Sequence, residues 1–252
     1  MRTSAWERVW SILRAVMAAL VVAAIVAQLA RSVGTANELG RDAATTVANF
    51  FSFFTILSNA LSAVVLLWAA IWFFSRGRTA TTEPPGLALA LASVTTYMII
   101  TGIVYNILLR HVVLPQGSEP IPWSNEVLHL IAPLFLLADL FVGPLRRALR
   151  WSALWAIIAF PIAWVLYTLA RGPLVTNPVT EAPYWYPYPF LDANNPDLVP
   201  PGYAGVGVYV VGIAIAIVAA GVLVVWVGRR RAAGRPAQPA DGTRTGTAPV
   251  SS

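Results

Sequence analysis

The chain has 252 residues, of which 58% are hydrophobic and 11% are charged, whereas soluble domains carry about 25% charged residues. It contains no cysteine, and its 17 basic residues are all arginine. These absences exclude disulfides, thiolate nucleophiles, thiolate metal sites and Schiff-base chemistry on a lysine amine.

Six long apolar runs follow one another along the chain. They span residues 10–30, 50–74, 86–109, 127–143, 151–170 and 203–227. A helix needs about 20 apolar residues to cross a bilayer, and barrel strands instead alternate over about 10 residues. The sequence therefore predicts an all-α, polytopic membrane protein, with one six-helix transmembrane bundle over residues 1–228.

The arginines are divided unequally between the two predicted sides of the membrane. The N-terminus, the second and fourth loops and the tail hold Arg2, Arg8, Arg14, Arg76, Arg78, Arg146, Arg147, Arg150, Arg229, Arg230, Arg231, Arg235 and Arg244. The other side holds Arg31, Arg41, Arg110 and Arg171. The positive-inside rule then predicts that both termini are cytoplasmic, and this topology accounts for the net charge of +6 without a nucleic-acid partner. Arginine in place of lysine is typical of a GC-rich bacterial genome, so we expect a multi-pass protein of the bacterial inner (plasma) membrane.

The two ends of the chain need separate interpretation. The first run has a basic start and small residues at 27–30, which also fits a cleaved signal peptide. Its apolar stretch exceeds the usual 7–15 or so residues of such a peptide, which favours a membrane helix. Residues 229–252 are rich in Ala, Pro, Gly and Thr, and they are predicted to form a disordered cytoplasmic tail.

Polar residues fall on one face of the second run. Ser52, Thr55, Asn59 and Ser62 lie within about 80° of one another at 100° per residue. Polar groups inside a membrane helix point into the bundle and deserve a functional interpretation. The alternative is simple hydrogen bonding between helices, which suits the serines best.

The fourth run carries a histidine beside a proline. Pro133 lies four residues after His129, so it cannot donate to the His129 carbonyl and should kink the helix there. A buried histidine is either a satisfied hydrogen-bonding residue or a proton-transfer group. Asp139, near the cytoplasmic end of this run, is predicted to pair with Arg146 or Arg147 in a structural role.

The second and fourth runs both pass from outside to inside, and Thr55 and His129 lie near their outer ends. We expect the two side chains to meet in the outer leaflet, with Asn106 of the third run at the same level. A threonine hydroxyl becomes a nucleophile when an adjacent base takes its proton, and neutral histidine can serve as that base. Asn59, Asn106 or Asn125 could donate to the developing oxyanion. The expected chemistry is acyl transfer to Thr55 followed by hydrolysis.

Two sequence patterns carry a family resemblance. The FFxFFTxLSN start of the second run and the NxxxHxxxP pattern formed by Asn125, His129 and Pro133 resemble the androgen-induced / androgen-dependent TFPI-regulating membrane protein family, in its bacterial six-helix branch. The resemblance covers about residues 10–227. It implies a hydrolase of fatty acid esters, with Thr55 as nucleophile and His129 as base and no metal or other cofactor. The YPYPFLD segment departs from the animal hydrolases, which leaves the bacterial substrate open.

The loop over residues 171–202 is the longest and is dense in proline and aromatic residues. One interpretation is an external aromatic belt, because Trp and Tyr favour the membrane interface. The other is a substrate lid over the outer mouth of the bundle. The lid candidates are Tyr184, Trp185, Tyr186, Tyr188, Phe190 and Asp192.

Four functions compete. The leading hypothesis is an intramembrane Thr/His hydrolase of lipid esters, whose partners are the bilayer and a lipid or amphiphilic substrate. The alternatives are a transporter or permease that uses the same polar faces, and a non-enzymatic lipid-binding membrane protein. A haem or quinone protein, with His111 and His129 as axial ligands, is a further possibility.

Overall fold

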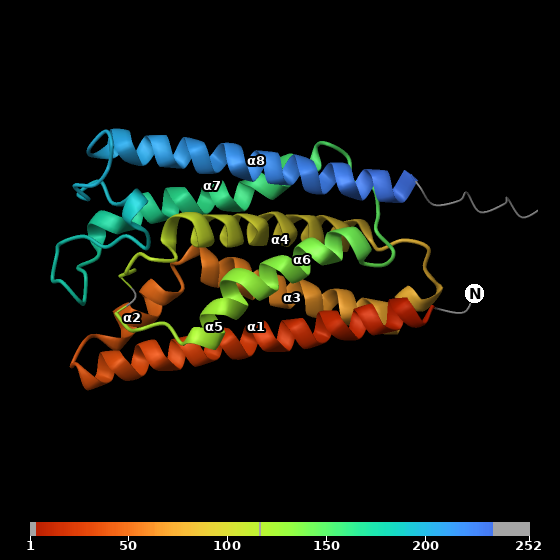
Figure 1. Ribbon diagram of the computed structural model, residues 1–252, viewed down its shortest axis with the longest axis horizontal. Helices are drawn as coiled ribbons and strands as arrows, with labels where there is room; N and C mark the ends of the chain where they lie inside the picture. The colour runs from red at the N-terminus through yellow and green to blue at the C-terminus, as the bar shows by residue number, and fades with distance from the viewer. Residues whose placement is uncertain (1–3, 116, 234–252) are drawn as a thin grey trace, which may run out of the picture.

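The computed structural model describes residues 4–115 and 117–233, whose regular secondary structure is entirely helical, with no strand among those residues (Figure 1). The α-helices are α1 (Ala5–Glu38), α2 (Ala43–Phe50), α3 (Phe54–Ser75), α4 (Pro85–Val104), α5 (Pro122–Glu126), α6 (Ala132–Val142), α7 (Ala153–Arg171) and α8 (Tyr203–Ala233). Two π-helical turns, η2 (Tyr105–Leu109) and η3 (Val127–Ile131), extend α4 and join α5 to α6. Short 3-10 helices lie at Gly77–Thr79, Gly172–Leu174 and Pro189–Leu191.

Six helical segments are long and apolar enough to cross a membrane, which confirms the predicted all-α class and number of apolar helices. They are Ala5–Glu38, Phe54–Ser75, Pro85–Leu109, Pro122–Val142, Ala153–Leu174 and Tyr203–Ala233. The third segment is the most buried, because α4 packs against α3, α6, α7 and α8. The fifth, which contains α7, is the least buried.

The helices run side by side along the long axis, so the bundle has two distinct ends (Figure 1). The start of α1 and the end of α8 lie at one end, which we call the terminal end. Helix α2 and the loop between α7 and α8 lie at the opposite end, which we call the loop end.

The second apolar run does not begin a continuous helix at Phe50, so that predicted boundary was wrong. Residues 51–53 form a turn between α2 and α3. The indole Nε1 of Trp164 donates to the carbonyl oxygen of Ser52 at 3.0 Å, so a side chain from α7 supplies a donor at this turn. Thr55 is therefore the second residue of α3.

Other boundaries also differ from the apolar runs. Helix α1 extends to Glu38 and α2 starts at Ala43, so most of the first predicted loop is helical. The fourth segment starts at Pro122, five residues before the apolar run, because proline suits the first turn of a helix. Arg229–Ala233 continue α8, which contradicts the predicted disorder there. The rest of the predicted tail, residues 234–252, lies outside the described residues.

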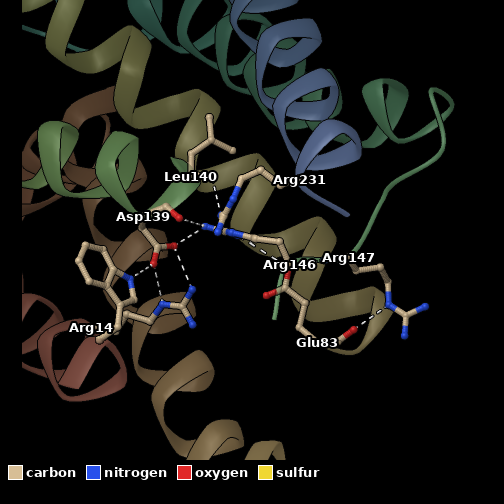
Figure 2. A network of polar contacts seen from close by, with 8 residues as sticks. Arg14, Glu83, Asp139, Leu140, Arg146, Arg147 and Arg231 are labelled. Atoms are coloured by element: carbon tan, nitrogen blue, oxygen red, sulfur yellow. Dashed lines mark hydrogen bonds and ion pairs between the residues drawn. The ribbon is translucent and has the colours of Figure 1, made fainter. Parts of the chain in front are cut away.

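A buried ionic network closes the terminal end (Figure 2). Asp139 accepts hydrogen bonds from Nε and Nη2 of Arg14 at 2.8 and 3.2 Å, and also from Arg146 and from the indole of Trp10. Glu83 lies 3.8 Å from Nη1 of Arg146. Because Arg14, Glu83 and Asp139 are at most 2% exposed, two cations and two anions balance one another inside the protein. The predicted structural pairing of Asp139 with Arg146 is confirmed.

Two further arginines tie this network to the backbone (Figure 2). Nε of Arg147 donates to the carbonyl oxygen of Glu83 at 2.7 Å, so Arg147 binds Glu83 and not Asp139. Nη1 of Arg231 donates to the carbonyl oxygen of Leu140 at 2.9 Å. The network therefore joins α1, α6, α8 and the loops before α4 and α7.

Candidate functional site

The polar face of α3 points into the bundle as the sequence predicts. Thr55, Asn59 and Ser62 are buried, and so is Ser58, which bonds with the hydroxyl of Thr101 on α4 at 3.0 Å. Hydroxyls and amides in an apolar bundle need partners, because an unpaired polar group there is costly. Those partners determine where Thr55 and His129 lie.

Pro133 and the π-helical turn before it leave two backbone carbonyls free in the fourth segment, and two asparagines satisfy them. In the π-helical turn the N–H of Ala132 donates to Val127, and Pro133 has no N–H to offer. Nδ2 of Asn59 donates to the carbonyl oxygen of Leu128 at 3.0 Å. Nδ2 of Asn106 donates to that of His129 at 3.0 Å. The segment stays helical from Pro122 to Val142 and changes only its hydrogen-bond pattern here, and the two asparagines fasten α3 and α4 to it.

The ring of His129 is held in one tautomer. Its Nδ1 lies 3.0 Å from the carbonyl oxygen of Asn125, and because a carbonyl only accepts, Nδ1 must donate. Nε2 therefore keeps a free lone pair, which is the form that a general base requires. The ring stacks on Tyr105 with centroids 3.6 Å apart, and Nδ2 of Asn125 donates to the Tyr105 hydroxyl at 2.7 Å.

Tyr188 covers the first turn of α3. The N–H of Thr55 donates to the Tyr188 hydroxyl at 3.2 Å, and the Thr55 hydroxyl lies 3.3 Å from the same oxygen. Phe53 precedes the helix and offers no side-chain cap, so the tyrosine replaces the usual capping residue. Burial raises the pKa of Tyr188 above its usual value, so the phenol keeps a proton that it can donate to Oγ1 of Thr55.

The aromatic loop is folded into the loop end of the bundle. Trp185, Tyr186, Tyr188 and Phe190 are buried, whereas Tyr184 and Asp192 are partly exposed. The Trp185 indole donates to the carbonyl oxygen of Pro115 at 3.1 Å, and Trp185 and Tyr188 both pack edge-on against Phe53.

Tyr186 packs tightly against the end of α7. A Cβ added at Gly172 would lie 2.1 Å from the Tyr186 ring, so only glycine fits there. Burial also raises the pKa of Tyr186 above its usual value, as does its hydrogen bond with Tyr203. Packed aromatic contacts therefore fix the loop directly above Thr55.

A cavity of about 300 Å³ brings Thr55 and His129 together. Tyr105, Asn125 and Ser124 also line it, together with the exposed residues Val113 and His111 near its mouth. We call this space the polar cavity. No hydrogen bond joins Thr55 to His129 in the described structure, since Thr55 bonds with Tyr188 and the His129 ring with Asn125.

The side-chain amides of Asn59, Asn106 and Asn125 differ in how many N–H bonds remain free to donate to an oxyanion. Both N–H bonds of Asn59 are used by backbone carbonyls, and so are both of Asn106. Asn125 lines the polar cavity and donates one N–H to the Tyr105 hydroxyl, which leaves its second N–H free. Tyr105 was not among the predicted site residues; its signal was its place one residue before Asn106, at the predicted depth of His129.

Comparisons with protein-family models, with curated proteins and with solved structures found no match to this chain. The family resemblance therefore stays a prediction from its two patterns. Within residues 4–115 and 117–233, no group of three or more His, Cys, Asp or Glu side chains is placed to hold a metal ion.

Proposed function

We propose that this protein is an intramembrane hydrolase of lipid esters, with Thr55 as nucleophile and His129 as general base. The six apolar helices cross the bacterial inner membrane in this proposal. The arginine distribution places the terminal end in the cytoplasm, so the loop end faces outward. The site then lies in the outer leaflet, where an amphiphilic ester and water can both reach it.

The observation that carries the proposal is the shared polar cavity. Thr55 and His129 come from segments 70 or so residues apart, yet they line the same space of about 300 Å³. The tautomer of His129 leaves Nε2 free to accept a proton. Tyr188 can donate to Oγ1 of Thr55, which leaves the threonine proton available for transfer to a base.

The reaction follows from these positions. Oγ1 of Thr55 attacks the ester carbonyl carbon, and its proton passes to Nε2 of His129 directly or through one water. The tetrahedral intermediate collapses, the C–O bond to the alcohol breaks, and His129 returns the proton to the departing alcohol oxygen. A water then gives a proton to the same Nε2 and attacks the acyl-threonine carbon. Collapse of this second intermediate releases the carboxylic acid and restores the Thr55 hydroxyl.

Three groups at the site can donate to the oxyanion. They are the N–H of Thr55 at the start of α3, the hydroxyl of Tyr105 and the second N–H of Asn125. The partial positive charge at a helix N-terminus favours an anion beside Thr55, and one well-placed donor contributes about 3 kcal/mol to transition-state stabilisation. Tyr188 accepts from the Thr55 N–H in the present structure, so this N–H becomes an oxyanion donor only when the tyrosine hydroxyl moves away, whereas Tyr105 and Asn125 can donate with Tyr188 in place.

The test is hydrolysis of a panel of fatty esters by the purified protein in detergent. Thr55→Ala should reduce turnover to background, and His129→Gln should lower kcat by about 10²–10⁴-fold. Thr96→Ala is a matched control, because Thr96 is buried in α4, donates to the Ala92 carbonyl and lines no cavity that Thr55 lines. Mass spectrometry of a rapidly quenched Thr55→Ser variant should detect an acyl group on residue 55.

Other outcomes distinguish the competing functions. Turnover that survives both Thr55→Ala and His129→Gln would refute the assignment of this pair. A wild-type protein that cleaves no ester but binds amphiphiles saturably would be a lipid-binding membrane protein. Substrate movement across sealed vesicles without cleavage would instead establish a transporter.

A further inference from the structure

A second cavity lies beside the polar cavity, among α4, α7 and α8. Its volume is about 210 Å³. Its walls are apolar side chains such as Val104 of α4, Ile158 and Ile162 of α7, and Ile213 and Ile217 of α8. Along α8 it extends from Val210 to Val218, about 12 Å at the helical rise of about 1.5 Å per residue.

The two cavities meet at the proposed nucleophile. Thr55 and Tyr105 line both of them, and Tyr188 and Phe190 close the apolar one at the loop end. A molecule that occupies both cavities would therefore lie against the side chain of Thr55. An ester with an apolar half and a polar half has this shape.

The apolar cavity also reaches the outside of the bundle. Ile162 of α7 and Val218 of α8 line it and are 50% and 43% exposed. Two hydrogen bonds to α7 flank this stretch. Tyr97 donates to the Ile157 carbonyl, which Pro161 leaves free, at 2.8 Å, and Trp164 donates to Ser52 at 3.0 Å. Ile158, Pro161 and Ile162 line the cavity between these two bonds, so its exposed wall lies on the stretch of α7 that faces α8.

We propose that this cavity is the acyl groove of the enzyme, and that it admits the fatty chain of the substrate sideways from the bilayer. The chain lies along α8, the ester carbonyl stops at Thr55, and the alcohol half occupies the polar cavity. A polar group in the groove would lose its hydrogen bonds to water, whereas a hydrocarbon chain leaves the bilayer at no such cost. The inference rests on the proposed hydrolase function and specifies its substrate as a long, linear acyl ester.

The groove predicts a chain-length profile for water-soluble monomeric esters. Each methylene that enters the groove should raise kcat/KM about fourfold. The increase should stop when the groove is full, because further carbons stay outside. Esters presented in a bilayer should lack this gradient, since their chains are already out of water.

The variant Ala214→Phe shortens the groove without disturbing the core. Ala214 lines the groove from an exposed position on α8. The added ring should move the plateau to shorter chains. Ala219→Phe is the matched control, because Ala219 is exposed on the same helix outside the groove. The inference is overturned if all three proteins, checked for equal thermal stability, share one profile.

A binding measurement separates this inference from the hydrolase proposal. Trp164 lines the groove, so a brominated long-chain alkyl ether, which has no ester bond, should quench its fluorescence saturably. The Trp164 signal is the difference between wild type and Trp164→Phe. Quenching that Ala214→Phe abolishes supports the groove even if no ester is cleaved, and it would then refute only the hydrolase. Quenching that is non-saturable, or equal in Ala214→Phe, refutes the groove whatever the activity.

Discussion

Replacement of Asp139 by asparagine should cause a large loss of stability, because Asp139 is the anion between two buried arginines. The wild-type network holds Arg14 and Arg146 against Asp139 and Glu83. Asp139→Asn leaves two cations with one anion, in a place where Arg14 is only 2% exposed. Breaking a buried pair in this way costs about 3–5 kcal/mol. At about 2–4 °C per kcal/mol for a chain of this size, the Tm should fall by about 6–20 °C.

The assay is thermal unfolding of the detergent-solubilised protein, followed by loss of the monodisperse peak in size-exclusion chromatography. Asp197→Asn is the control, because Asp197 is exposed in the loop before α8, and its Tm should match wild type. The double variant Arg14→Met, Asp139→Asn restores the balance to one cation and one anion, so it should be more stable than Asp139→Asn alone. A double variant whose loss equals the sum of the two single losses would show that charge balance does not explain the network.

Three further predictions concern single polar groups. Tyr188→Phe leaves the buried N–H of Thr55 without its acceptor, and Asn106→Leu leaves the His129 carbonyl without its donor. Each variant should therefore lower the free energy of unfolding by about 1–3 kcal/mol, measured by denaturation in mixed micelles. An unchanged stability in either variant would contradict the assigned contact. Burial raises the pKa of Glu83 above its usual value of 4.5. Its contribution to stability is therefore full below about pH 4.5 and lost as the pH rises through the raised pKa. Glu83→Gln should flatten the dependence of Tm on pH, and an identical slope in both proteins would refute this.

The effect of Pro133 on the backbone near His129 is the part of the candidate site that the sequence predicts best. Pro133 lacks an N–H wherever it is placed, so the sequence alone shows that the His129 carbonyl loses its helical donor. Which donor replaces it depends on the neighbouring helix. Asn106 takes that place because α4 passes close to α6, as the 3.0 Å approach of a Cβ at Gly102 to Pro133 shows. The sequence therefore predicts that the His129 carbonyl needs another donor, and the packing of α4 against α6 determines that this donor is Asn106.

The turn before α3 could not be predicted, because FFSFF contains neither proline nor glycine and suits a helix. At this turn the Ser52 carbonyl accepts from Trp164 of α7, more than 100 residues away, which is a partner that no local pattern reveals. This turn places Thr55 in the first turn of α3 and leaves its N–H for Tyr188. The role of Tyr188 depends on the same long-range contact, so the loop sequence alone suggested only a lid or a belt.

Arg14 was missed for a different reason. Arg14 is one of the arginines that define the predicted cytoplasmic side, although it lies inside the first apolar run. A charge inside an apolar run requires a partner of opposite charge. Asp139 is an acidic residue inside the fourth apolar run, so it is the natural partner of Arg14. Pairing the two would have predicted the contact between α1 and α6 that the structure contains.

The two ends of the bundle differ in what lies between the helices: buried ion pairs at the terminal end and an apolar cavity near the loop end. At the terminal end, ion pairs fill the space between the helices with charges that balance. Near the loop end, apolar side chains leave a groove of about 210 Å³, and an empty cavity of that volume would cost about 5 kcal/mol at about 24 cal/mol per Å³. A protein in a bilayer avoids that cost when a hydrocarbon chain occupies the groove. Under the proposed function, the acyl chain of a lipid ester would fill the gap among α4, α7 and α8 and remove this cost.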